Sequence, residues 1–307
     1  MTHYGALIKE VGRGARGARS LDRAPAAALF GDILDGRVPD MELGALLIAL
    51  RIKGESCDEV LGFHDALQAR TARVRVPEGP RLVVLPALNG ARKLANLMPL
   101  VALLLARRGV PVLIHGRHDF DNRVDSFALL DALDLPRAGH LDEVEQQLQS
   151  RRVAVAPLPL LCPGLDALMA LRSRLGVRNS AHIMAKLLDP APGRSLRVVA
   201  VTHPEYLDSM TEALPVLCRD SGGQALLMRA CEGEAHAHLR RKAWMRRFGP
   251  DGSTELQTGE DDLAQPLFEQ ADTADNAALI RTLLTQDAPL PARIVEQVDA
   301  LEALARA

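Results

Sequence analysis

The stretch LPALNGARKLANLMPLVALLLARRGVPVLIHG, residues 85–116, predicts the fold of the larger part of this chain. An apolar run over Arg81–Leu85 ends at a proline and an Asn-Gly pair, which is typical of a buried strand that turns into a loop. The nearly all-apolar segment Leu97–Ala106 ends at two arginines and Gly109, as a buried helix does. Val110–Ile114 then has the pattern of a second buried strand. The stretch therefore predicts a βαβ unit.

A βαβ unit binds ligands beyond the carboxyl ends of its strands, at an edge of the sheet that we call the rim. Two short segments of the unit follow its strands and carry cations and histidines. They are Asn89, Gly90, Ala91, Arg92 and Lys93 after the first strand, and His115, Gly116, Arg117 and His118 after the second. We therefore expect the two segments to lie side by side at the rim.

Four segments in a fixed order carry a resemblance to a known family. They read ELGALLIALRIKGE at residues 42–55, NGARKLAN at 89–96, GVRNSAH at 176–182 and HPEY at 203–206. With them the chain resembles the anthranilate phosphoribosyltransferase fold family of glycosyltransferase family 3, and within it the YbiB-like nucleic-acid-binding branch. The resemblance covers most of the chain and weakens after about Pro250.

The resemblance implies an α/β protein with a small discontinuous all-helical domain and a large α/β domain, whose mostly parallel central sheet is flanked by helices. Residues 1–72 with 164–190 would form the helical dimerisation domain, and residues 73–163 with 191–307 the α/β domain. The predicted helix Met41–Lys53 is apolar nearly all round, whereas a surface helix needs only one apolar stripe. We therefore expect a homodimer through the N-terminal helices.

Composition places the chain among ordinary globular proteins. Its 307 residues are 48% hydrophobic and 25% charged, with a formal net charge of −2. No apolar run approaches the roughly 20 residues of a membrane span. The four cysteines have neither the spacing of metal ligands nor that of a disulfide framework, as expected for free thiols in a reducing cytosol. We expect a cytoplasmic protein that does not bind a membrane.

Phosphoribosyl transfer at the rim would need small residues to cradle a diphosphate, cations and hydroxyls to hold phosphates, and carboxylates to hold Mg²⁺. In the first loop Pro86 offers no N–H group, and only Gly90 is small and flexible. The family's Asn-Ser-Thr positions fall at Asn96, Met98 and Pro99, so both hydroxyls are missing.

Two further family motifs have also changed. The phosphate-binding lysine of the family is replaced by Ile114, and the metal motif becomes CEGEA at residues 231–235, without an adjacent pair of carboxylates. Together these departures predict a degraded site, with no catalytic residue, no metal and no cofactor. The residues left in this vestigial ligand pocket are Asn89, Gly90, Ala91, Asn96, His115, Gly116 and His118. For His115, a buried core histidine is the alternative interpretation.

A basic run lies near the C-terminal third of the chain. Residues 236–248 contain five Lys and Arg residues and no acid, interleaved with Trp244 and Phe248. Basic side chains bind phosphates and aromatic side chains can stack on bases, although a solvated loop is the alternative interpretation. Eight acidic residues between 251 and 275 conceal this run in the net charge.

The sequence thus predicts a protein that binds DNA or RNA with little sequence preference, along a basic groove of the dimer. The expected binding residues are Arg13, Arg16, Arg19, Arg92, Lys93, Arg117, Arg172, Arg240, Arg241, Lys242, Trp244, Arg246 and Arg247. Arg172 falls where the resemblance places an anthranilate-contacting arginine of the enzymes, and a solvated helix face is equally consistent with it. The alternative function is a phosphoribosyltransferase or phosphorylase-like enzyme with an altered acceptor.

Overall fold

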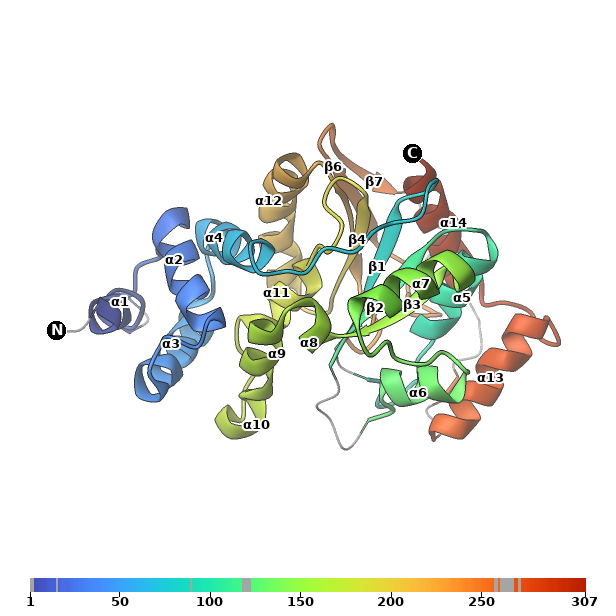
Figure 1. Cartoon of the computed structure of the whole chain (residues 1–307), viewed down its shortest axis with the longest axis horizontal. Coiled ribbons are helices and arrows are strands. Elements are labelled where there is room, and N and C mark those ends of the chain that lie inside the picture. Colours follow the sequence, from blue (N-terminus) through green and yellow to red (C-terminus); the bar gives the residue numbers. More distant parts are fainter. Residues whose placement is uncertain are drawn as a thin grey trace. The chain divides into compact units, whose positions relative to one another are not determined.

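The computed structural model describes residues 3–14, 16–88, 90–117, 123–256, 259, 268–269 and 272–307. Two compact units are present: Met1–Ala72 with Leu161–Leu188, and Arg73–Leu160 with Asp189–Ala307. From the sequence, the second segment of the helical unit was expected at residues 164–190, and in the structure this segment is Leu161–Leu188. The first unit is all-helical and the second is α/β with a mostly parallel sheet, which confirms the predicted fold class (Figure 1).

The described residues of the helical unit form seven helices. They are α1 (His3–Val11), α2 (Arg23–Leu34), α3 (Asp40–Lys53), α4 (Cys57–Gln68), α9 (Pro163–Ala170), α10 (Arg172–Leu175) and α11 (Ala181–Leu187). The rings of Phe30 and Phe63 stack with centroids 4.6 Å apart and join α2 to α4. Helix α4 begins with a capping box, in which Ser56 and Glu59 satisfy each other's backbone N–H groups. Helices α9 and α10 are separated at Leu171.

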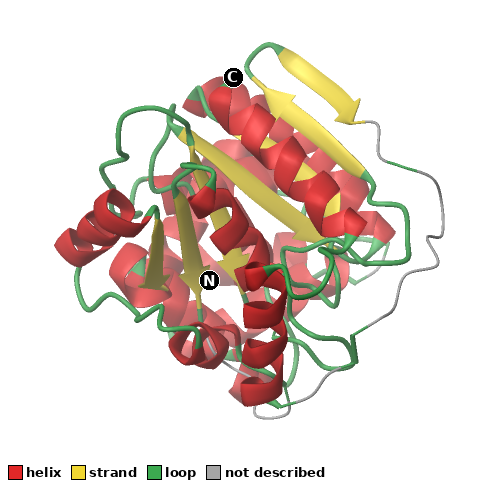
Figure 2. Cartoon of the chain, turned by 90° about the vertical axis from the view of Figure 1, so that its right-hand side faces the viewer, coloured by secondary structure: helices red, strands yellow, loops and turns green. Residues whose placement is uncertain are grey.

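A seven-stranded sheet forms the centre of the α/β unit. Its strands are β1 (Leu82–Ala87), β2 (Val112–Gly116), β3 (Val153–Pro157), β4 (Ser195–Val201), β5 (Gln224–Arg229), β6 (Met245–Gly249) and β7 (Gly252–Leu256). The spatial order is β3-β2-β1-β4-β5-β6-β7, with β1 to β5 parallel. Strands β6 and β7 are antiparallel and lie at one edge of the sheet (Figure 2).

Strand β6 corrects the interpretation of residues 236–248 as a loop from Met245 onward, whereas residues 236–244 contain neither helix nor strand. Met245 and Phe248 of β6 are buried, and β6 pairs with the buried strand β5. Two consecutive arginines stand between these apolar residues, so the sequence pattern does not show the strand.

Helices cover both faces of the sheet. In this unit they are α5 (Met98–Arg107), α6 (Ser126–Ala132), α7 (Leu141–Arg151), α12 (Pro204–Ser221), α13 (Thr273–Thr285) and α14 (Ala292–Arg306), and the short α8 (Leu158–Leu161) follows β3. Val83 and Leu85 of β1 share one apolar core with Val298 of α14 and with α5. On the other face, Arg197 of β4 contacts Cys218 of α12. The C-terminal part of this unit consists of the two helices α13 and α14.

Within the part of the chain that the structure describes, no helix combines the length and the apolar character needed to cross a membrane.

Candidate functional site

The strand order places a topological switch point between β1 and β4, where the connections from the parallel strands diverge. The loops that follow β1, β2, β4 and β5 all leave the sheet at its rim. Gly90, in the loop after β1, has φ +64°, and a Cβ there would lie 2.6 Å from the carbonyl oxygen of Val124. This position therefore requires glycine, because the chain combines a left-handed conformation with a close backbone approach.

The carboxylate of Glu232, from the loop after β5, lies against the backbone of the loop after β1. The backbone N–H groups of Arg92, Lys93 and Leu94 donate to its Oε2 over 2.7, 2.9 and 3.3 Å. Burial by itself would raise the pKa of Glu232. The three N–H groups, with the charge of Arg123, outweigh burial and hold the pKa of Glu232 below its usual value.

A second carboxylate, that of Glu234, is completely buried two residues later. Its Oε1 accepts a hydrogen bond of 2.9 Å from the N–H of Gly90, and its Oε2 accepts one of 2.7 Å from the hydroxyl of Ser126. The side-chain amide of Asn96 donates to Ser126 over 2.8 Å and to Glu234 over 3.4 Å. The two glutamates thus bind the loop after β1 along most of its length.

The donor set does not fit the Mg²⁺ site of the resembled enzymes. Both carboxylates of the 231–235 segment accept hydrogen bonds from N–H or O–H groups of the neighbouring loop and helix. Across the described ranges, no group of three or more His, Cys, Asp or Glu side chains is arranged to hold a metal ion.

Five exposed cations gather on two adjacent segments of the rim. Leu94 and Leu239 line the same small internal cavity, so the segments that contain them are neighbours. The exposed cations on these segments, which we call the rim cations, are Arg92, Lys93, Arg240, Arg241 and Lys242. Arg117, half-buried, follows β2 at the same edge of the sheet.

Arg246 and Arg247 do not belong with the rim cations, contrary to the expectation of one continuous basic loop. Both lie on β6. Arg247 forms an ion pair of 2.6 Å with Asp251, and the guanidinium of Arg246 lies 5.5 Å from the ring centroid of Phe248. Trp244 is half-buried just before this strand.

The residues of the expected vestigial pocket are largely enclosed. Gly90, Ala91 and Asn96 are buried. His115 and Gly116 lie within β2 and not in the loop after it, and both are buried, which agrees with the alternative interpretation of His115 as a buried core histidine. Asn89 and His118 fall outside the described residues.

The remaining candidates lie in the helical unit. Arg13, Arg16 and Arg19 are exposed between α1 and α2, and Arg13 forms an ion pair of 3.1 Å with Glu10. Arg172 is half-buried at the start of α10. The predicted binding residues are therefore divided between two units, and the rim cations form the set that the structure brings together.

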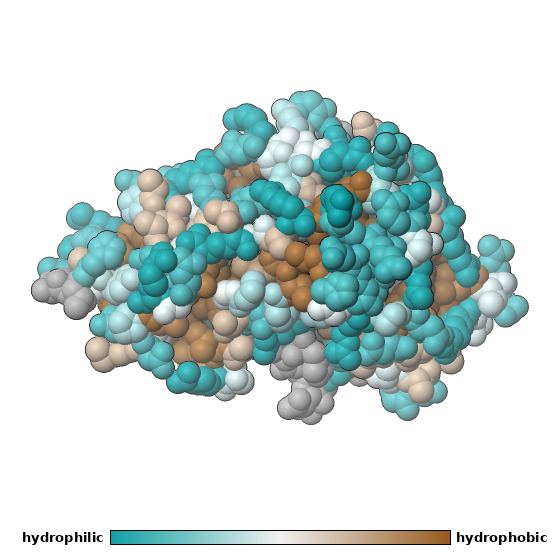
Figure 3. Space-filling model, in the orientation of Figure 1, coloured by the Kyte–Doolittle hydropathy of each residue, from teal (hydrophilic) through white to brown (hydrophobic). Residues whose placement is uncertain are grey.

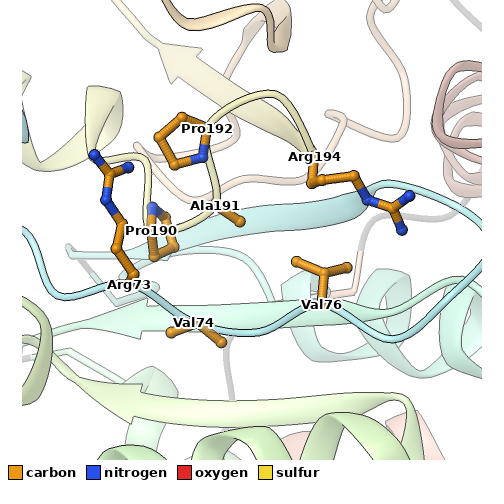
Figure 4. A pocket seen from close by; sticks show the side chains of 7 residues that line it. All are labelled: Arg73, Val74, Val76, Pro190, Ala191, Pro192 and Arg194. Atoms are coloured by element: carbon orange, nitrogen blue, oxygen red, sulfur yellow. The ribbon is translucent and has the colours of Figure 1, made fainter.

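A hollow of about 360 Å³ lies at the opposite edge of the sheet, close to the start of β4. It is lined by Arg73, Val74, Val76, Pro190, Ala191, Pro192 and Arg194. Figure 4 shows the guanidinium groups of Arg73 and Arg194 at its two ends. Arg194 donates to the carbonyl oxygens of Pro77 and Gly79, so this arginine fastens the chain segment before β1.

The sequence prediction missed Ser126, Arg123 and the role of the two glutamates. It treated Glu232 and Glu234 only as the remains of a metal motif. One signal was available: two carboxylates flank a glycine directly after the last parallel strand, and therefore at the rim. Ser126 gave no such signal, because it lies at the first position of α6 and reaches the site only through the fold.

Comparison with known proteins identifies the family. Residues 6–71 match the glycosyl transferase family, helical bundle domain. The chain is 40% identical over 291 residues to the Escherichia coli K12 protein named "Uncharacterized protein YbiB", covering 94% of this chain and 90% of that protein. The chain belongs to the YbiB family.

This chain also resembles a group of enzymes in sequence and in fold. This chain is 28% identical over 301 residues to an anthranilate phosphoribosyltransferase of Anaeromyxobacter sp. Fw109-5, covering 92% of this chain and 85% of the enzyme. The crystal structure of anthranilate phosphoribosyltransferase from Thermus thermophilus superposes with a TM-score of 0.77 at 24% identity, over 97% of this chain and 94% of that one. The α/β unit and the helical unit therefore have the anthranilate phosphoribosyltransferase fold.

Proposed function

We propose that this chain binds nucleic acid with little sequence preference through the rim cations, and that it does not transfer phosphoribosyl groups. One observation carries the proposal. The carboxylate of Glu232 accepts hydrogen bonds from the N–H groups of Arg92 and Lys93, while the side chains of these two residues are exposed. The loop that would receive a diphosphate is thus closed by the protein itself, and the cations beside it face solvent.

Electrostatics supports a polyanion as the partner of these cations. A phosphate that is neutralised by Lys or Arg releases condensed counterions, so the logarithm of the affinity falls with the logarithm of the salt concentration. The slope is about −0.9 per contact on duplex DNA. If each of the five rim cations of one protomer contacts one phosphate, these contacts contribute about −4 to −5 to the slope, and two protomers bound to the same nucleic acid contribute about twice that. Such binding reads the backbone and not the base edges.

The experiment compares two triple variants in a salt-titrated binding assay with single-stranded DNA, duplex DNA and RNA. Arg240→Ala, Arg241→Ala and Lys242→Ala together should weaken binding of every sequence equally and make the slope less steep by about 3 for each protomer that contacts the nucleic acid. The matched control removes three exposed arginines that precede β2, β3 and β5 at the opposite edge: Arg107, Arg151 and Arg219. The control should bind like the wild type. A wild type that shifts no nucleic acid at low salt would exclude the proposal.

The second candidate function is phosphoribosyl transfer to an altered acceptor. Its support is the similarity to anthranilate phosphoribosyltransferases over 92% of the chain. Against it stand the hydrogen-bonded state of Glu232 and Glu234 and the absence of hydroxyls at Met98 and Pro99. Removal of one stabilising donor in an active site can reduce a rate by about 10²–10³, so several losses should leave no useful transfer.

Calorimetry separates the two candidates. We expect no Mg²⁺-dependent binding of phosphoribosyl diphosphate and no product from anthranilate. Binding at micromolar affinity that requires Mg²⁺ would favour the transferase. The result is independent of the nucleic-acid assay, because the two ligands are titrated separately.

A further inference from the structure

We infer that Glu232 is a built-in competitor at an anion site formed by the backbone N–H groups of Arg92, Lys93 and Leu94, and that a phosphoryl group binds there only when this carboxylate leaves. The inference deepens the proposed function and rests on it in so far as the phosphate belongs to a nucleic acid.

The anion site can be located because the carboxylate of Glu232 occupies it. Successive backbone N–H groups that converge on one point form a concave nest for an anion. Here three consecutive N–H groups converge on Glu232 Oε2 over 2.7–3.3 Å, and Lys93 N–H also lies 3.1 Å from Oε1. Carboxylate and phosphate oxygens accept the same charge-assisted hydrogen bonds. A phosphoryl oxygen could therefore replace a carboxylate oxygen at this position.

The two glutamates of the segment differ in how firmly they are held. Glu234 is fully buried and bonded to Gly90, Ser126 and Asn96, so it fixes the turn in place. Glu232 is only half-buried, and its backbone has φ +54°, a left-handed conformation that is unfavourable for a residue other than glycine. The carboxylate of Glu232 can therefore leave the nest while Glu234 keeps the loop folded.

The charges around the nest also change when this carboxylate leaves. Arg123 is close enough to Glu232 to help lower its pKa, and the side chains of Arg92 and Lys93 extend from the nest residues themselves. With Glu232 in place, its negative charge offsets part of this positive field and repels an arriving phosphate. Once it has left, the same cations attract the phosphate.

The test is a calorimetric titration with pyrophosphate, without metal, of the wild-type protein and three variants. Glu232→Gln keeps the size of the side chain and removes its charge. Glu232→Gly removes the side chain and also suits the left-handed backbone. Glu78→Gln is the matched control, because Glu78 is exposed in the segment before β1. A tethered group competes at an effective concentration of about millimolar or more.

Both Glu232 variants should therefore bind pyrophosphate about tenfold tighter or better than the wild type, and Glu78→Gln should match the wild type. Affinities of the Glu232 variants within twofold of the wild type would overturn the inference. So would tighter binding that leaves the amide resonances of Arg92, Lys93 and Leu94 unmoved in NMR spectra.

If the variants do not fold, the wild-type protein alone can test the inference by NMR. Pyrophosphate at high concentration should move the three amide resonances and the side-chain carboxyl carbon resonance of Glu232 together. Binding that leaves the Glu232 carboxyl resonance in place, or no movement of these resonances, contradicts the inference. The source of the phosphate is tested by adding single-stranded DNA to the same sample. If DNA fails to bind but pyrophosphate behaves as expected, the proposed function fails and the competitor role of Glu232 stands.

Discussion

Glu234 Oε2 accepts a hydrogen bond of 2.7 Å from the hydroxyl of Ser126, and the two residues lie 108 positions apart in the sequence. Both are buried, and the bond joins the start of α6 to the loop after β5. Because Glu234 also holds Gly90, a single carboxylate fixes three separate segments at the rim. The shape of the candidate site therefore depends on this buried network.

Substitution Ser126→Ala should reduce the free energy of unfolding by about 1–3 kcal/mol, because the buried carboxylate of Glu234 loses a hydrogen-bond donor. The matched control is Ser253→Ala on β7, where an exposed serine accepts a hydrogen bond from Arg246. This control should change stability by no more than about 0.5 kcal/mol. Urea unfolding followed by circular dichroism measures both values. Equal effects of the two substitutions would show that the network does not hold the site.

The amino-acid sequence was sufficient to predict parallel strands of the sheet. Strands β1 and β2 and helix α5 are mostly apolar runs bounded by proline, glycine and arginine. Their composition and these terminating residues identify them in the sequence. It was insufficient for β6, where buried Met245 and Phe248 are separated by Arg246 and Arg247. The side chains of Arg246 and Arg247 are accommodated by the ring of Phe248, by Asp251 in the turn and by Ser253 of β7, and the contact with Ser253 exists only after β6 and β7 have paired.

The candidate site was predicted less completely, for a physical reason. The exposed cations Arg92, Lys93 and Arg240 could be proposed from residue type alone. The bonds from Arg92, Lys93 and Leu94 to Glu232 span 138–140 residues, and no local pattern contains them. The loop sequence therefore suggested a lost diphosphate site, but it did not show that a carboxylate of the same chain now occupies its N–H groups.

A second prediction concerns pH, through His236. Burial is the main cause that lowers the pKa of His236 to about 4, and its Nδ1 lies 3.2 Å from the carbonyl oxygen of Ala237, to which the neutral ring donates. An unfolded histidine has a pKa of about 6.5. Between these two values the unfolded state binds a proton that the folded state does not, so stability falls as the pH falls. The stability that the neutral ring of His236 contributes is fully present above about pH 6.5. The free energy of unfolding changes with pH through this residue by at most about 1.4 kcal/mol per pH unit.

His236→Asn should remove this contribution, because an asparagine amide can still donate to Ala237 but does not titrate. The free energy of unfolding of the variant should therefore vary less between pH 4.5 and 6.5 than that of the wild type, by roughly 1 kcal/mol per pH unit. His203→Asn is the control: His203 is exposed before α12 and makes no side-chain capping bond. It should leave the wild-type slope unchanged. A slope that is the same in all three proteins would refute the prediction.

The last prediction is a homodimer formed through the helical unit. Met41, Ala45, Ile48 and Ile52 follow one another at helical spacing along a single face of α3, and all four are exposed. Met41 is 79% exposed and Ile52 74%. Apolar surface is visible over this part of the helical unit in Figure 3. An apolar stripe of this kind on an exposed helix is typical of a protein interface, and a second copy of the chain would cover it.

The double substitution Ile48→Asp and Ile52→Asp should make the protein monomeric in light scattering at micromolar concentration, because the charged side chains cannot be buried without partners. The control is Ala24→Asp with Ala28→Asp, which places two acids on exposed positions of α2 and should keep the dimer. A dimer carries two sets of rim cations, so the monomeric variant should also bind nucleic acid with a slope against salt that is about half that of the wild type. A wild type that is already a monomer, or a double variant that remains a dimer, would exclude α3 as the interface.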